Sequence, residues 1–298
     1  MSSMKDVFSS YHPAINFSFF TIVIFCGMFF LHPLLLVISL SAAFLYYYYL
    51  NGKKALKLFF IIVLPMMVGV SLINPLFNHR GVTVLGYFRH NPITQESIFY
   101  GAITGLMFGT IILWFACYNK VMTSDKFVYL FGRIIPSMSL IFSMVLRFVP
   151  KFTSQFRIVS DAQRTLGRDV GDKGKFQKIR QGIKETSIMV TWSLENSLDT
   201  ADSMKARGYG LPGRTAFSIF RLDSRDKLLL VGLGGIVIVL IGGVILDQHR
   251  VQYFPRIIIP ETTSFSYILY GVYTILCLLP IILNVVEDLK WKHLQSRI

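Results

Sequence analysis

The sequence is poor in charged residues. Asp, Glu, Lys and Arg make up 15% of its 298 residues, whereas soluble globular chains carry about 25%. Hydrophobic residues make up 53%, and the mean hydropathy is +0.54. This shortage of charge argues against a soluble domain and predicts a chain embedded in a lipid bilayer.

Several chemical motifs are also missing from the sequence. It contains no G-x-x-x-x-G-K-[ST] loop, so the chain is not expected to bind ATP in that way. It has no His/Glu cluster with metal spacing and no Gly-x-Ser-x-Gly elbow. We therefore expect a non-catalytic protein with no cofactor and no metal of its own.

Cysteine is scarce as well. Cys26, Cys117 and Cys277 each lie inside an apolar run, too scattered for a disulfide framework or a zinc site. They are interpreted as small apolar fillers. Only Lys5 precedes the first apolar run, and no small-residue cleavage site follows it, so a removable signal peptide is not expected.

Long apolar runs are what the sequence has in abundance. A membrane span needs about 20 mostly apolar residues. Pro65 lies within one of the runs and predicts a kink there. The fold class is predicted as all-α, a polytopic membrane protein with about six transmembrane helices and long cytoplasmic helices. The six segments are residues 15–31, 33–50, 58–77, 97–118, 228–246 and 265–286.

The distribution of Lys and Arg predicts the orientation. The net charge is +14, and residues 150–225 hold 14 basic against 8 acidic residues, a net of +6. Lys and Arg stay preferentially on the cytoplasmic side, so this segment and both termini are predicted to be cytoplasmic in the plasma membrane. Binding to nucleic acid is the weaker explanation, because the positive charge lies mainly beside apolar runs.

Residues 120–149 are apolar but interrupted by Arg133, Pro136 and Arg147. They fit a seventh span or a helix along the inner membrane interface, and the charge balance favours the interface. The predicted organisation has three parts. They are N-terminal transmembrane helices in 1–119, the interfacial helix with cytoplasmic helices in 120–225, and C-terminal transmembrane helices in 226–298.

Two helices are predicted in the cytoplasmic part. The first runs from about Pro150 to Gly167, with charged residues on one face. The second runs from about Phe176 to Arg207 and is roughly 45 Å long. A helix this amphipathic would expose a large apolar face to water, so we expect that face to pack on the membrane-facing helices, on a partner, or on both. Its apolar stripe consists of Phe176, Ile179, Ile183, Val190, Leu194, Leu198 and Ala201.

The second helix ends in Ala206-Arg207-Gly208. Gly208 can adopt the left-handed conformation that closes a helix, and the helix dipole favours a cation at Arg207. A purely structural role therefore explains these residues. In the functional interpretation, the small residues enter a narrow groove and the guanidinium forms paired hydrogen bonds with a carboxylate.

These residues resemble the transmembrane T component of energy-coupling factor (ECF) transporters, a family that includes the cobalt-transport permease. The resemblance extends over about residues 60–245. It also rests on Asn74-Pro75-Leu76 followed by Gly81-Val82-Thr83, and on Arg147-Phe148-Val149-Pro150. The family carries two Ala-Arg-Gly signatures, one at the end of each of two cytoplasmic coupling helices.

Only the second signature is intact in this chain. The first, Ala-Gln-x-Ala-Arg-Gly in the family, reads Ala162-Gln163-Arg164-Thr165-Leu166-Gly167. Thr165 and Leu166 stand where the family has Ala and Arg, and Arg164 or Arg168 could supply the charge. The residues implied to dock an ATPase are Ala206, Arg207, Gly208, Arg164, Gly167 and Arg168.

The resemblance implies a coupling subunit with three kinds of partner. Two cytoplasmic ATP-binding cassette ATPases bind the ATP, a small membrane subunit captures a vitamin or metal ion, and the bilayer surrounds the spans. Two alternatives stay open, a permease with its own substrate path and an intramembrane enzyme. The interiors of the six spans hold no Asp, Glu, Lys, Arg or His, groups that ion-driven carriers keep at membrane depth.

Overall fold

The structure is a computed structural model of the chain. It describes residues 6–88, 91–132, 136–166, 175–211, 220, 222–246, 251–258 and 263–295.

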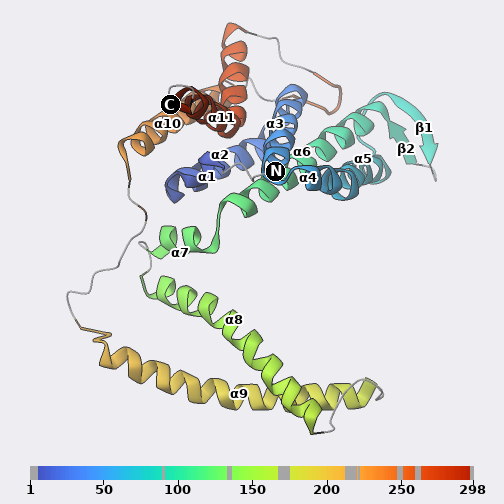
Figure 1. Cartoon of the computed structure of the whole chain (residues 1–298). Coiled ribbons are helices and arrows are strands. Elements are labelled where there is room, and N and C mark those ends of the chain that lie inside the picture. The colour runs from blue at the N-terminus through green and yellow to red at the C-terminus, as the bar shows by residue number, and fades with distance from the viewer. Residues whose placement is uncertain are drawn as a thin grey trace. The chain divides into compact units, whose positions relative to one another are not determined.

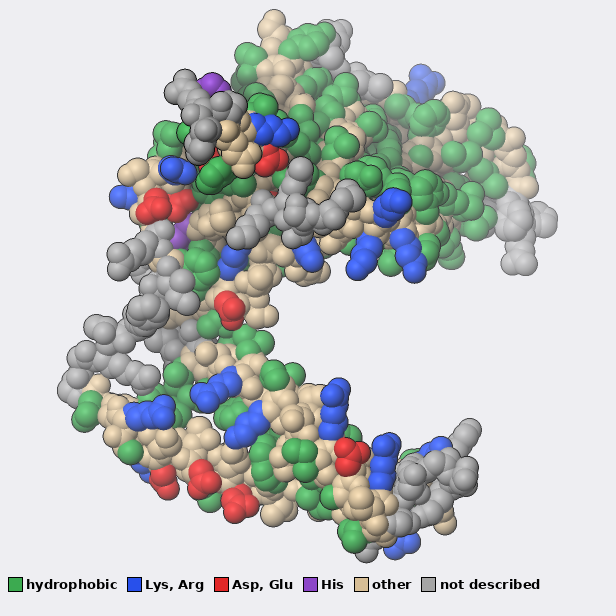
Figure 2. All heavy atoms as spheres, in the orientation of Figure 1, with side chains coloured by type: hydrophobic (Ala, Val, Ile, Leu, Met, Phe, Trp, Pro, Cys, Tyr) green, Lys and Arg blue, Asp and Glu red, His purple; other side chains and the backbone are tan. Residues whose placement is uncertain are grey.

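The chain divides into two compact units. Met1–Lys126 and Phe220–Ile298 form the transmembrane unit, and Phe127–Ile219 form the arm unit. Hydrophobic side chains predominate on the visible face of the transmembrane unit, whereas the arm unit mixes hydrophobic and charged ones (Figure 2).

The transmembrane unit is built mainly of helices (Figure 1). Its elements are α1 (Val7–Ser10), α2 (Pro13–Phe29), α3 (Pro33–Asn51), α4 (Lys53–Leu58), the π-helical segment η1 (Phe59–Val63), α5 (Leu64–Phe77), β1 (Val84–Phe88), β2 (Asn91–Thr94), α6 (Gln95–Val121), α10 (Ser224–Ile245) and α11 (Ser264–Gln295). The helix α7 (Ser124–Gly132) begins in this unit and continues into the arm unit, which also holds α8 (Pro136–Thr165) and α9 (Lys175–Ala206).

The predicted apolar helices are confirmed. Five helical stretches are long and apolar enough to cross a membrane, and Pro13–Phe29 is a shorter apolar helix of 17 residues. The disturbance expected near Pro65 takes the form of η1, which ends at Val63, two residues before the proline. Proline has no N–H to donate, and local π-helical hydrogen bonding is one way in which a helix accommodates this loss.

The core of the transmembrane unit is aromatic. Phe8, Phe19, Phe20, Tyr46 and Trp114 are fully buried together. Phe19 meets Phe8 and Trp114 edge to face, with ring centroids 5.1 and 5.8 Å apart. Such pairs contribute about 0.5–1.5 kcal/mol beyond the burial of their area. Phe8 therefore joins α1 to α2 and α3, and Phe19 continues the aromatic contact to α6.

The helices α5 and α6 approach each other closely along a row of glycines. Gly101, Gly105 and Gly109 of α6 recur every four residues and face α5. A Cβ added at Gly105 would lie 2.6 Å from the carbonyl oxygen of Met67. This is the small-residue packing by which helices associate inside membranes, where no hydrophobic force brings them together.

The loop between α5 and α6 contains a β-hairpin that the sequence analysis did not predict. β1 pairs antiparallel with β2, and the buried carboxylate of Glu96 accepts hydrogen bonds from the backbone N–H and hydroxyl of Thr83, at 3.2 and 2.9 Å. Gly81 has φ +146°, and a Cβ there would lie 2.5 Å from Glu96 Oε2. The Gly81-Val82-Thr83 motif therefore has a structural role: Thr83 donates hydrogen bonds to the Glu96 carboxylate, and Gly81 leaves room for it.

Residues 120–149 contain the end of α6, the short helix α7 and the first half of α8. None of these α7 or α8 residues belongs to a helix that qualifies as a span in the described part of the chain. Arg133 lies outside the described residues, and an interfacial position for this segment stays a prediction.

The predicted start of the first arm helix was wrong. α8 begins at Pro136 rather than Pro150, and Pro150 lies inside it. A proline in a helix interior removes one backbone hydrogen bond and usually breaks the helix. Here the helix continues through Pro150. One turn of helix earlier, the carbonyl of Leu146 is the group that loses its donor, while the Thr153 hydroxyl makes an ordinary hydrogen bond to the Val149 carbonyl, 2.8 Å away.

Replacing Gly105 with alanine should destabilise the transmembrane unit. The new Cβ collides with the backbone of Met67, and overpacking of this kind costs about 1–3 kcal/mol. The measurement is the thermal unfolding midpoint of the detergent-purified chain. Gly234→Ala is the matched control, because a Cβ at Gly234 meets nothing within 4 Å. Equal midpoints for the two variants would contradict the glycine packing.

Candidate functional site

In the arm unit, α8 and α9 form an antiparallel pair that is held by side-chain contacts near its middle. Lys151 Nζ of α8 donates to Asn196 Oδ1 of α9 at 2.7 Å. Phe152 meets Trp192 edge to face at 5.5 Å, and the Lys151 ammonium lies over the same indole ring.

A second contact lies nearer the end of α8. Gln181 Nε2 of α9 donates to Gln163 Oε1 of α8 at 3.4 Å, and Gln181 is buried. As Figure 1 shows, α8 crosses α9, and these side-chain contacts run along α9 from Gln181 to Asn196, so that only the last turns of α9 extend beyond them. Two contacts along the pair fix its crossing angle, because rotation about one contact would separate the other.

Helix α9 confirms the predicted second arm helix, and its apolar stripe is exposed. Phe176 is 81% exposed and Leu198 69% exposed, and the stripe residues between them are exposed as well. Exposed apolar patches of this extent mark surfaces that contact proteins or membranes.

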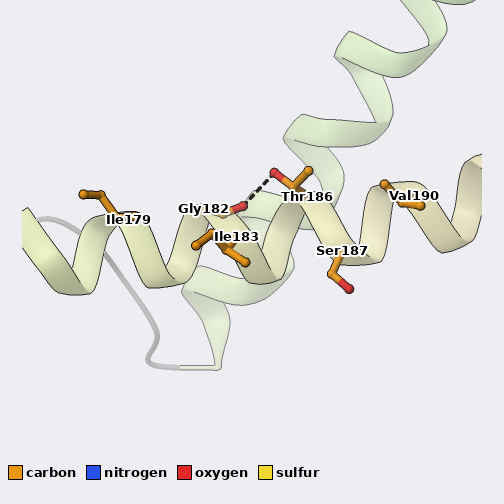
Figure 3. A pocket seen from close by; sticks show the side chains of 6 residues that line it. All are labelled: Ile179, Gly182, Ile183, Thr186, Ser187 and Val190. Atoms are coloured by element: carbon orange, nitrogen blue, oxygen red, sulfur yellow. Dashed lines mark hydrogen bonds between the residues drawn. The ribbon is translucent and has the colours of Figure 1, made fainter.

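A shallow hollow lies on this stripe (Figure 3). All of its lining residues come from α9, and the Thr186 hydroxyl donates to the Gly182 carbonyl at 2.8 Å, so it is satisfied within the helix. None of the side chains that line the hollow is titratable. Its lining consists of Ile179, Gly182, Ile183, Thr186, Ser187 and Val190.

The end of α9 is closed by a Schellman motif. Gly208 has φ +80°, its N–H donates to the Lys205 carbonyl at 2.9 Å, and the Tyr209 N–H donates to the Met204 carbonyl at 3.0 Å. These are the two hydrogen bonds that define the motif. Arg207 is the cap residue between helix and turn, and its side chain is exposed. Gly208 therefore has the predicted structural role, and this role leaves the Arg207 guanidinium at the surface.

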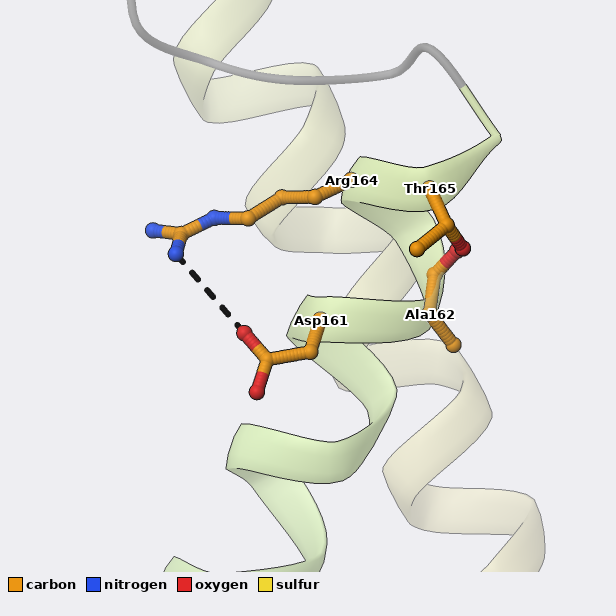
Figure 4. Close-up of polar contacts among 4 residues, drawn as sticks. All are labelled: Asp161, Ala162, Arg164 and Thr165. Carbon is orange, nitrogen blue, oxygen red and sulfur yellow. Dashed lines mark hydrogen bonds and ion pairs between the residues drawn. The ribbon is translucent and has the colours of Figure 1, made fainter.

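The end of α8 carries the altered signature (Figure 4). Arg164 folds back along the helix to pair with Asp161 at 3.7 Å, and both side chains are more than half exposed. An exposed pair of this kind contributes only a few tenths of a kcal/mol. The Thr165 hydroxyl donates to the Ala162 carbonyl at 2.8 Å, and Leu166 is exposed. Gly167 and Arg168 lie outside the described residues.

The structure does not bring the two groups of predicted site residues together. Gln163 lies opposite Gln181, which precedes Arg207 by 26 residues of continuous helix. At 1.5 Å per residue this is roughly 40 Å. The arm unit therefore presents two separate ends.

The sequence analysis missed the residues that fix the crossing. Trp192 and Lys151 were not singled out, although a tryptophan within a charged helix and a phenylalanine at Phe152 on the other helix were signals of an aromatic contact. In the part of the chain that the structure describes, no three His, Cys, Asp or Glu side chains are grouped so that they could hold a metal ion.

Known proteins similar to this chain include three transporter components. The EcfT energy-coupling factor transporter transmembrane protein of Lactococcus lactis subsp. cremoris is 32% identical over 108 residues, 36% of this chain and 41% of the relative. Its Lactobacillus helveticus counterpart is 30% identical over 106 residues, 33% and 38% of the two chains. That of Streptococcus thermophilus is 27% identical over 192 residues, 59% and 72% of the two chains.

The match with the first two relatives spans about two fifths of their length. A family model extends further, because that of CbiQ, cobalt transport protein, matches residues 8–219. This range includes α2 to α6 of the transmembrane unit and the helices α7, α8 and α9. The chain therefore belongs to the CbiQ family of cobalt transport proteins.

Proposed function

We propose that the chain is the transmembrane coupling subunit of an ECF-type importer. The observation that carries the proposal is the arm unit with two separate ends, roughly 40 Å apart by helix length. A subunit that links two ATPases needs two docking points on one stiff connector. The antiparallel pair supplies the connector, because its two contacts prevent the helices from turning about each other.

Arg207 is the proposed docking residue at the end of α9. The hydrogen bonds of Gly208 and Tyr209 occupy two carbonyls of the last turn, so the guanidinium can bond outward to a carboxylate on an ATPase. Ala206 and Gly208 allow a close approach on either side. At the other end, Arg164, Gly167 and Arg168 are proposed to dock the second ATPase, with Asp161 as the competing partner of Arg164.

The exposed apolar stripe of α9 is proposed to face the membrane or the small capture subunit, since water would not favour it. Closure of the ATPases on ATP would then move the arm and release cargo from the capture subunit. The cargo class is a vitamin or a metal ion. Both termini lie in the cytoplasm in this arrangement, and the ATP is bound by the ATPases.

The proposed function predicts a stable complex. The tagged chain, expressed with its neighbouring genes and extracted in mild detergent, should retain two ATPase subunits and one small membrane protein. The subunits are identified by mass spectrometry. Purification of the chain with no ATPase would contradict the proposal, and binding of a small-molecule cargo to the isolated chain would favour a permease with its own substrate path.

Reversing the charge of Arg207 should impair coupling. Arg207→Glu places a carboxylate against the proposed acidic groove, and we expect ATP-driven uptake to fall by about tenfold or more. Lys205→Glu is the matched control, because Lys205 is also exposed and lies two residues earlier on the same helix. Uptake in proteoliposomes is the measurement. Wild-type uptake by Arg207→Glu would remove Arg207 from the mechanism.

The altered signature should tolerate the loss of its leucine. Leu166→Ala removes an exposed apolar side chain that replaces the arginine of the family. We expect the affinity for ATPase to change by less than about threefold, since exposed substitutions are usually worth under about 0.5 kcal/mol. Titration of the reconstituted complex measures it. If Leu166→Ala lowered the affinity for the ATPase as much as Arg207→Glu does in the same titration, Leu166 itself would contact the ATPase.

A further inference from the structure

Lys126 is a buried lysine at the start of α7. It is only 8% exposed, and its ammonium donates to the backbone carbonyls of Ser9 and Val121, the latter at 3.0 Å. Burial lowers the pKa of Lys126, while the nearby Asp6 raises it. A buried charge is costly unless it is well hydrogen-bonded, so these contacts are what keep Lys126 in place.

The two carbonyls lie at the ends of helices. Val121 is the last residue of α6, and Ser9 lies in the single turn of α1. Carbonyls in the last turn of a helix lack an intrahelical partner and carry the negative end of the helix dipole. One ammonium therefore completes the hydrogen bonding of two helix ends that are 112 residues apart in sequence.

A buried asparagine of the first span joins the same cluster. Asn16 of α2 is fully buried. With its amide oriented to satisfy both neighbours, it donates to the Phe8 carbonyl at 2.9 Å and accepts from Lys126 Nζ at 3.1 Å. A buried amide is retained only where it is paired, and Asn16 thus links α1, α2 and α7.

The other end of the N-terminal segment is fixed to two further helices. Asp6 accepts hydrogen bonds from the Tyr46 hydroxyl of α3 at 3.0 Å and from Asn284 Nδ2 of α11 at 2.7 Å. Asn284 Oδ1 in turn accepts from the Val7 N–H at 2.7 Å. Phe8 lies between them, fully buried in the aromatic core.

We propose that residues 6–10 and Lys126 form a clamp that holds the start of α7 against α2, α3, α6 and α11, which makes Lys126 a positioning residue for the coupling motion. The chain leaves the transmembrane unit at this point, after a break of two residues, Met122 and Thr123, between α6 and α7. A break of two residues between helices lets the chain bend there, unless the helix that follows the break is held in place. The clamp holds it, so that movement of the arm is passed to the spans instead of being lost by bending here.

The mechanical role rests on the proposed function, whereas the clamp itself does not. The experiment therefore has two readouts on the full complex. Hydrogen exchange followed by mass spectrometry reports whether residues 7–10 and 122–128 are held. Uptake per ATP hydrolysed, in proteoliposomes, reports whether holding them matters for coupling.

Lys126→Met removes the ammonium and keeps most of the chain length. We expect exchange in both segments to become about tenfold faster or more, as for loss of a buried charged hydrogen bond, and uptake per ATP to fall while ATP hydrolysis persists. Lys126→Arg, which keeps the charge and the donors, should restore both readouts in large part. Lys120→Met is the matched control, since Lys120 is exposed near the same end of α6, and it should behave as wild type.

Unchanged exchange in Lys126→Met would overturn the clamp, whatever the uptake. Faster exchange with unchanged uptake per ATP would overturn its role in coupling. If Lys126→Met does not fold, Tyr46→Phe tests the clamp instead. It removes only the hydroxyl that donates to Asp6, and it should speed hydrogen exchange in residues 7–10. If the wild-type chain binds no ATPase, the proposed function fails, and the exchange measurements on the chain still test the clamp.

Discussion

A peptide group inside hydrocarbon has no water to bond with, so each of its polar atoms needs a partner in the protein. The apolar segments of the transmembrane unit meet this requirement by forming continuous helices, in which the backbone groups bond to one another. Irregular backbone occurs where they end, and side chains complete the hydrogen bonding there. Glu96 accepts hydrogen bonds from the loop before the hairpin, and Lys126 donates to carbonyls at the ends of α1 and α6.

The absence of water in the hydrocarbon also explains how the spans associate. Because hydrocarbon is as apolar as the side chains, helices gain little from hiding leucine or valine from it. α5 and α6 instead gain close contact through three glycines, and α1 to α3 gain it through interlocking aromatic rings. The polar cluster around Asp6 and Lys126 adds bonds that a lipid cannot replace.

The sequence predicted what depends on neighbouring residues. The apolar runs gave the spans, because length and hydropathy alone decide them, and helical spacing located α9 to within one or two residues. Gly208 likewise indicated its own left-handed turn. These features need no knowledge of distant contacts.

Features that depend on distant partners could not be predicted in this way. Asn16 and Lys126 looked unrelated, since 110 positions separate them. Pro150 was interpreted as a helix start, the usual place for proline, and only the structure shows α8 continuing through it. At the candidate site, the separation of the two ends depends on where α8 and α9 cross, and that point is set by Trp192 and Gln181.

The uninterrupted course of α9 from Trp192 to Arg207 constrains how this segment can vary in length. Each inserted or deleted residue moves the arginine by about 1.5 Å and turns it by roughly 100° about the axis. A change of seven residues restores its direction to within about 20°. Substitutions should be tolerated along this stretch far more readily than insertions, because the number of residues, more than their identity, sets the direction in which the arginine points.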